Sequence, residues 1–225
     1  MKVYRVGTQM LQIQKLALVA AMAAAGALCS CAQLTYPLPN YEAAYSKAAL
    51  VSPAPQLVGL TAADAARVAR GRYLVDITGC AACHTDGALI GEPNPARALA
   101  GSQMGIAYTD PSRTGFPGIV YPPNLTPDPA TGLGRWSDKQ IADAIRVGVA
   151  GPDGAPGHLA VMSWPLYARL TADDVDAIVA YLRAIAPVEH RVPERVPVGT
   201  RGKTPYVHFG VYQSGPDIHP NSVPR

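Results

Sequence analysis

Aromatic residues are scarce in this sequence. Phe, Trp and Tyr make up 7% of the 225 residues, whereas the chain holds 22 prolines and 21 glycines. So few large apolar side chains argue against a large sheet core, and the prolines and glycines favour short helices joined by long irregular connections. The length suits one domain of ordinary size with extensions and is too short for two large domains.

The amino-terminal apolar run is too short for an ordinary membrane-spanning helix. This uncharged run, Leu16 to Leu28, has 13 residues, and three basic residues precede it. The pattern is typical of an export signal over residues 1–30. The tetrapeptide Leu28-Cys29-Ser30-Cys31 resembles the lipobox of bacterial lipoproteins. Cys31 is therefore expected to become the lipidated first residue of a periplasmic, membrane-anchored protein. A plain signal cleaved nearby and an uncleaved anchor are the alternatives.

The expected mature chain has no excess of charge of either sign. Three of the 19 Lys and Arg residues and none of the 16 Asp and Glu residues lie in the export signal, which leaves 16 against 16. The sequence also contains no basic stripe with interleaved aromatic residues. Its composition therefore gives no reason to expect binding of nucleic acid.

Cysteine is rare, with four residues in the chain, and two of them lie in the lipobox region. The other two, Cys80 and Cys83, are followed directly by His84, which is the C-x-x-C-H attachment pattern of a c-type haem. Each thiol can add to one vinyl group of the porphyrin, and the imidazole can bind the iron. A redox dithiol and half of a zinc site are weaker alternatives, because structural zinc needs four ligands and no second Cys pair follows. One covalent haem c is therefore predicted.

A sixth iron ligand is expected, because the porphyrin supplies four and His84 supplies one. Met162 is the preferred candidate, since it lies just before the last predicted helix and a neutral thioether raises the reduction potential. Met104 is the only other methionine after the signal, in a Gly-rich loop close to the haem motif. His158, four residues before Met162, is the main rival. An open or exchangeable position is the remaining alternative.

Two further side chains are candidates for contacts with the haem propionates. Trp136 is expected to pack on the haem edge with its indole N–H directed at a propionate, and a core tryptophan with another partner is the alternative. Arg146 lies near the end of a predicted helix, where it either pairs with a propionate or is a solvated surface residue.

Three helices are predicted from their caps and their apolar spacing. Each begins at a Ser or Thr that is followed three residues later by an acidic residue or Gln. The predicted ranges are about 61–77, 137–148 and 171–186. The third helix is expected to cross the first near Gly71 and Tyr73, where a residue without a side chain permits close approach.

The remaining segments divide the chain into parts. Residues 1–30 are the signal, 31–60 a Pro-rich tether, 61–190 the haem domain and 191–225 an extended tail that wraps the domain or docks on a partner. Within the haem domain, residues 85–129 show no sustained periodicity and are expected to form a loop that covers the cofactor.

The chain resembles class I cytochrome c over about Thr61 to Val188. The resemblance is carried by the segments Gly71 to Val75, Gly79 to His84, Asn124 to Asp128, Thr131 to Asp138, Ala144 to Gly148 and Met162 to Leu182. The chain is similar in particular to the haem domains of the cytochrome subunits of bacterial membrane-bound alcohol, aldehyde and gluconate dehydrogenases. Those subunits usually carry three haem motifs and a Pro after the axial Met, whereas this chain has one motif and Ser163.

The resemblance implies an all-α fold with about three main helices around one haem, and electron transfer in the periplasm in place of catalysis. The expected donor is a periplasmic or membrane-bound dehydrogenase, and the expected acceptor is an oxidase or another cytochrome. A haem enzyme or sensor with an exchangeable sixth ligand is the alternative function.

Overall fold

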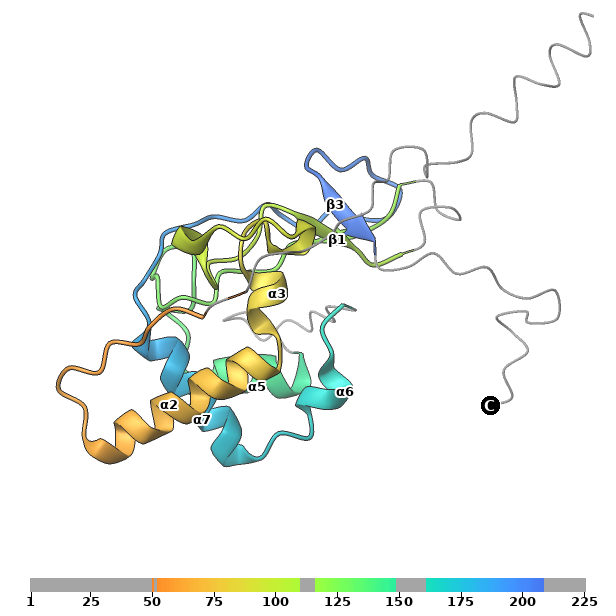
Figure 1. The fold of residues 1–225 in the computed structure, drawn as a ribbon. Helices are drawn as coiled ribbons and strands as arrows, with labels where there is room; N and C mark the ends of the chain where they lie inside the picture. Colours follow the sequence, from red (N-terminus) through yellow and green to blue (C-terminus); the bar gives the residue numbers. More distant parts are fainter. Residues whose placement is uncertain (1–49, 51, 110–115, 149–160, 209–225) are drawn as a thin grey trace, which may run out of the picture. The chain divides into compact units, whose positions relative to one another are not determined.

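Five α-helices, two 3-10 helices (Ala88–Ile90 and Pro95–Arg97) and three short strands are present in the residues that the structure describes, which are 50, 52–109, 116–148 and 161–208. This computed structural model is drawn in Figure 1. The helices are α2 (Ala62–Ile77), α3 (Cys80–His84), α5 (Asp138–Val147), α6 (Trp164–Tyr167) and α7 (Ala172–Ala184). The strands are β1 (Gly105–Ala107), β2 (Ile119–Val120) and β3 (Tyr206–His208).

The three predicted helices are confirmed as α2, α5 and α7, each with the predicted cap. The hydroxyl oxygens of Thr61 and Thr171 each accept a hydrogen bond of 3.1 Å from the backbone N–H three residues later. Ser137 and Gln140 form a complete capping box. These bonds satisfy backbone donors that would otherwise have no partner at a helix start.

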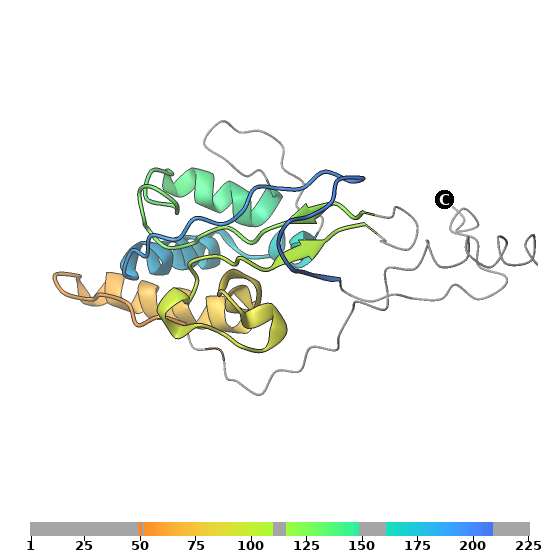
Figure 2. The ribbon, with the colours of Figure 1, turned by 90° about the horizontal axis from the view of Figure 1, so that it is seen from above.

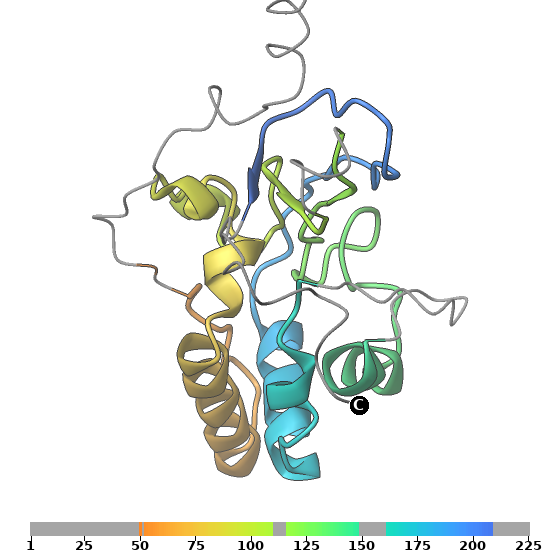
Figure 3. The same cartoon turned by 90° about the vertical axis from the view of Figure 1, so that its right-hand side faces the viewer.

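The packing of α7 against α2 confirms the predicted crossing at Gly71. A Cβ atom at this position would overlap the carbonyl oxygen of Ala177 and crowd the Cβ of Tyr181. Only glycine therefore allows the two helices to lie this close. Figure 3 shows α7 between α2 and α5. Tyr73 does not take part in the crossing, because its side chain is 53% exposed and lies under the Arg70 guanidinium.

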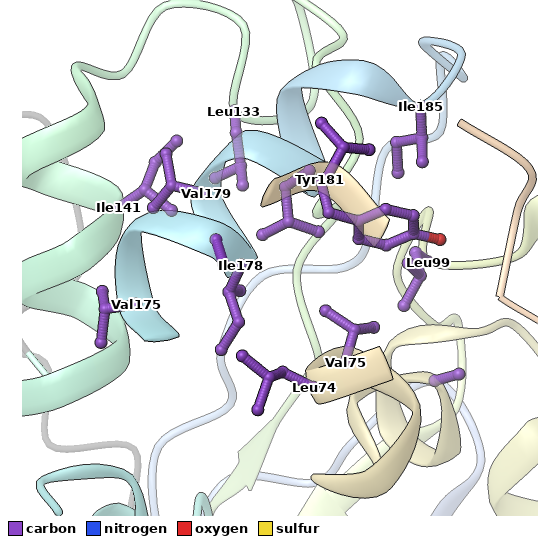
Figure 4. Close-up of a cluster of buried hydrophobic side chains, with 14 residues drawn as sticks. Leu74, Val75, Leu99, Leu133, Ile141, Val175, Ile178, Val179, Tyr181 and Ile185 are labelled. Carbon is purple, nitrogen blue, oxygen red and sulfur yellow. The ribbon is translucent and has the colours of Figure 1, made fainter. Parts of the chain in front are cut away.

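The apolar core lies along α7. Buried side chains of α7 pack against those of α2 and α5 and against Leu99 and Leu133, which lie between α3 and α5 (Figure 4). Tyr181 and Val75 are completely buried at the centre of this cluster. The core thus joins the helix that leads into the haem motif to the helix that follows Met162.

A small sheet corrects the all-α expectation, although most residues in the regular elements of the described part are helical. β1 pairs with β2 in antiparallel and with β3 in parallel orientation. Figure 2 shows β1 and β2, coloured green, side by side. The strands are two or three residues long and come from the covering loop and the tail, where no periodic pattern marked them. Ile106 and Ile119 are buried, so their backbone groups must find partners within the protein, and strand pairing supplies them.

Both flanking segments contact the haem domain. Ser52 is 1% exposed and its hydroxyl bonds the carboxylate of Asp76, while the Tyr181 hydroxyl donates to the carbonyl oxygen of Pro53 at 2.7 Å. In the tail, Val196 exchanges two backbone hydrogen bonds with Ile119. Part of the predicted tether and part of the predicted tail therefore pack on the domain.

The predicted signal over residues 1–30 and the predicted lipidation site Cys31 lie outside the described residues. Within the ranges that the structure describes, no helix combines the length and the apolar character needed to cross a membrane.

Candidate haem site

A cavity of about 420 Å³ lies between α3, α5, α7 and the segment that leads into α6. Five of the residues proposed as haem contacts line it: Cys80, Cys83, His84, Trp136 and Met162. Much of the remaining wall is aliphatic, from Leu125, Leu133, Ile145, Ile178 and other residues. The volume lies in the range of small-molecule sites, and the apolar wall suits a flat, largely apolar cofactor.

The haem motif forms one helical turn that starts at a sharp bend. Gly79 has φ +73°, in the left-handed region that glycine adopts without strain, and it turns the chain from α2 into α3. Residues three apart lie on one face of a helix, so the turn presents the Cys80 and Cys83 sulfurs to the same side. Neither forms a disulfide in the described part of the chain. Burial raises the pKa of each thiol, and this penalty on ionisation disappears once the sulfur is a thioether.

The hydrogen bond of His84 determines which of its ring nitrogens is available to a metal. Nδ1 lies 2.8 Å from the carbonyl oxygen of Pro123. A carbonyl oxygen can only accept, so Nδ1 carries the proton and Nε2 keeps its lone pair. Burial lowers the pKa of His84, more than the bond to Pro123 raises it, which favours the neutral ring. The imidazole is therefore in the form that binds iron, with its orientation set by Pro123.

Asn124 holds the segment that contains Pro123, and sequence analysis did not single it out as a site residue. Its side chain is 2% exposed. Nδ2 donates to the hydroxyl of Thr131 at 3.0 Å and to the carbonyl oxygen of Val188 at 2.8 Å. Oδ1 accepts from the backbone N–H of Thr126 at 2.9 Å and from its hydroxyl at 2.8 Å. The amide thus uses both of its ends to fix the loop next to the His84 acceptor.

Met162 lines the cavity and Met104 does not. The Met162 side chain is half-buried and lies in the segment just before α6. His158, its rival from the sequence, lies outside the described residues. The geometry thus favours Met162 over Met104, and the assignment of Met162 as the sixth ligand stays a prediction.

The two candidates for propionate contacts differ in their position. Trp136 is half-buried in the cavity wall, and the guanidinium of Arg183 donates to its carbonyl oxygen. Arg183 also bonds the carbonyl oxygen of Leu133 at 2.9 Å and so holds this corner of the loop against α7. Arg146 is exposed and is not among the residues that line the cavity. Both propionate contacts stay predictions.

Tyr167 is a residue of the cavity wall that sequence analysis missed. Its hydroxyl donates to the carbonyl oxygen of Thr78 at 3.0 Å, across 89 positions of sequence. Burial raises the pKa of Tyr167 to about 12, so the phenol keeps its proton at neutral pH. The sequence offered no local signal for this bond, because both partners lie at the ends of helices that meet only in the folded chain.

The cavity, its pair of thiols and its neutral imidazole define a site for a covalently attached haem, and comparison with known proteins agrees. The cytochrome c family model matches residues 68–186, more than half of the chain. The chain therefore belongs to the cytochrome c family and carries one covalently bound haem c.

Several relatives are subunits of dehydrogenases. The chain is 35% identical over 135 residues to the cytochrome c subunit of the quinone-dependent alcohol dehydrogenase of Gluconobacter oxydans (strain 621H), an alignment that covers 59% of this chain and 25% of the relative. It is 35% identical over 128 residues to the fructose dehydrogenase cytochrome subunit of Gluconobacter japonicus, covering 56% of this chain and 23% of the relative. It is also 35% identical over 127 residues to the gluconate 2-dehydrogenase cytochrome c subunit of Pantoea cypripedii, with 56% and 25% covered. The chain thus spans about a quarter of the length of these curated relatives.

Proposed function

We propose that the protein is a periplasmic, lipid-anchored carrier of single electrons between a dehydrogenase and the respiratory chain. The observation that supports this most directly is that Cys80, Cys83, His84 and Met162 line one cavity. In the proposal the sulfurs of Cys80 and Cys83 would hold the haem, and His84 Nε2 and the Met162 sulfur would be the two protein ligands of its iron. When bound, haem would supply reversible one-electron exchange. With both of these ligands supplied by the protein, no place at the iron would be left for a substrate.

The proposed donor is a dehydrogenase, because three of the relatives are named as cytochrome subunits of dehydrogenases. An oxidase or another cytochrome is the proposed acceptor. Three exposed aliphatic side chains lie within two positions in sequence of residues that line the cavity: Ile77, Val147 and Leu166 are 59%, 61% and 68% exposed. In the proposal they form an apolar rim, which suits the small, weak interface of a transient electron-transfer complex.

The rim can be tested with one matched pair of variants. Leu166→Asp places a charge on the rim, whereas Leu57→Asp places one on an exposed residue of the segment before α2. With the dehydrogenase that co-purifies with the holoprotein, we expect Leu166→Asp to raise KM about five-fold or more and Leu57→Asp to leave it unchanged. Equal effects of the two variants would contradict docking at the rim.

The proposed lipid at Cys31 restricts the carrier to a membrane surface. Because Ser52 is packed on the domain, the chain available as a free tether extends at most over residues 32–51. Fully extended, this length reaches about 70 Å. Replacement of Cys31 by Ser should release the holoprotein from the membrane fraction, and its retention there would contradict the proposed anchor.

The ligand set is tested by spectroscopy of the ferric holoprotein. We expect the Met-sulfur charge-transfer band near the red edge to vanish in Met162→Ala and to survive in Met104→Ala and His158→Ala. Loss of the band in Met104→Ala alone would show that the assignment is wrong. Rapid stoichiometric binding of carbon monoxide by the wild-type ferrous protein would favour the enzyme or sensor alternative, because it requires an exchangeable sixth position.

A further inference from the structure

The segment from Val161 to Leu170 carries Met162 to the cavity. The backbone bonds of its described residues are local, as in the donation from the N–H of Tyr167 to the carbonyl oxygen of Ser163 at 3.2 Å. The side-chain bond from Tyr167 to Thr78 leaves the segment and ties it to the end of α2. A hydrogen bond has a preferred direction, which apolar packing lacks.

The acceptor of this bond is itself rigid and lies next to the haem attachment. Thr78 caps the end of α2, where its backbone N–H and its hydroxyl both donate to the carbonyl oxygen of Leu74, at 2.9 and 2.7 Å. Its hydroxyl also lies 3.4 Å from the sulfur of Cys80. The phenol of Tyr167 therefore connects the segment that bears Met162 to the segment that bears the first attachment cysteine.

We propose that Tyr167 is a positioning residue for the sixth ligand, which its hydrogen bond to Thr78 keeps at the haem iron. This inference rests on the proposed role of Met162. The hydroxyl favours the closed arrangement, in which the sulfur faces the cavity, over an open one, in which the segment moves away. Without the bond the open arrangement gains population, and the position that the sulfur leaves becomes accessible to an external ligand.

The test measures imidazole binding to the ferric holoprotein, because imidazole competes with the methionine sulfur for the iron. In Tyr167→Phe the ring stays and one hydroxyl is lost. We expect the apparent Kd for imidazole to fall about three- to ten-fold, as the loss of one net hydrogen bond implies. The Met-sulfur charge-transfer band should disappear at a lower temperature, and the midpoint potential should fall because methionine ligation raises it.

Tyr181→Phe is the matched control. The hydroxyl of Tyr181 also joins distant segments, since it donates to the carbonyl oxygen of Pro53 at 2.7 Å, and burial likewise raises the pKa of Tyr181 to about 12. Tyr181 is not among the residues that line the cavity. We expect this variant to lower the stability of the fold while it leaves the imidazole Kd and the midpoint potential unchanged.

Three results would overturn the proposal: an unchanged imidazole Kd in Tyr167→Phe, an equal fall in Tyr181→Phe, or a Tyr167→Phe variant that does not take up haem. The last would assign the hydroxyl to folding and not to ligand placement. Failure of the ligand assignment is recognised separately, because the charge-transfer band would then be absent from the wild type or would persist in Met162→Ala, whatever the behaviour of Tyr167→Phe.

Discussion

Replacement of Asn124 by Ala tests whether the loop beside His84 is held by one buried amide. The Asn124 side chain makes four hydrogen bonds, two as donor and two as acceptor. Without it, the backbone N–H of Thr126 loses the partner that it has in the structure, and it lies in a fully buried residue. The carbonyl oxygen of Val188 keeps one longer bond, of 3.3 Å, from the Thr126 hydroxyl.

The magnitude follows from these partners. An orphaned buried N–H costs about 1–3 kcal/mol, and each of the two lost donor bonds contributes about 1 kcal/mol net. We therefore expect Asn124→Ala to lower the free energy of unfolding by about 3–5 kcal/mol. This is a large part of the total stability of an ordinary domain, which is about 5–15 kcal/mol.

Asn94→Ala is the control, because it makes the same chemical change at an exposed site. The Asn94 side chain accepts one hydrogen bond, from the backbone N–H of Ala96 at 3.0 Å. Its replacement should cost about 1 kcal/mol or less. Guanidinium unfolding of the holoproteins, followed by Soret absorbance and circular dichroism, gives both values. If Asn124→Ala cost no more than Asn94→Ala, the reasoning that this amide holds the loop would be refuted.

Two further predictions concern the helix crossing and the response to acid. Gly71→Ala should destabilise the holoprotein by about 2 kcal/mol or more in thermal unfolding, because the added Cβ overlaps the Ala177 carbonyl. Alanine by itself favours helices, so a stabilised variant would contradict this close contact. Burial opposes ionisation of Asp86, but the Gln103 backbone N–H and the Arg97 guanidinium outweigh it and hold its pKa below the ordinary value. The stability that this carboxylate contributes is therefore present above its unfolded pKa, about 3.9, and is lost as the pH falls further. In urea unfolding, the free energy of unfolding of Asp86→Asn should be lower than that of the wild type at pH 6 and approach it at pH 3. A difference between the two proteins that grows in acid would contradict the lowered pKa of Asp86.

The helices were predictable because their signals are local. The caps at Thr61, Ser137 and Thr171 each involve two residues that are three positions apart, so both partners can be recognised in a short stretch of sequence. The sheet was not predictable from such signals. Its strands have two or three residues, and β1 joins β3 across about a hundred positions of sequence. No period of two can be recognised in so short a segment, and pairing over such a distance depends on how the intervening chain folds.

The site shows the same division. The residues Cys80, Cys83 and His84 form a contiguous motif, whose chemistry requires only that they be neighbours, and the family comparison agrees with the covalent haem that the motif implies. The place of Met162 before the last predicted helix favours it over Met104, and the structure adds that Met162 lines the cavity whereas Met104 does not.

The sequence by itself determined the haem attachment motif, the three main helices and the close approach at Gly71. The motif and the helix caps depend on residues within one helical turn, and the close approach depends on the absence of a side chain in glycine. Only the tertiary structure decided which side chains support the site. One acceptor of Asn124, the carbonyl oxygen of Val188, lies 64 positions away, and the acceptor of Tyr167 lies 89 positions away. Such bonds form because burial leaves polar groups without water, and which groups then meet depends on the path of the whole chain.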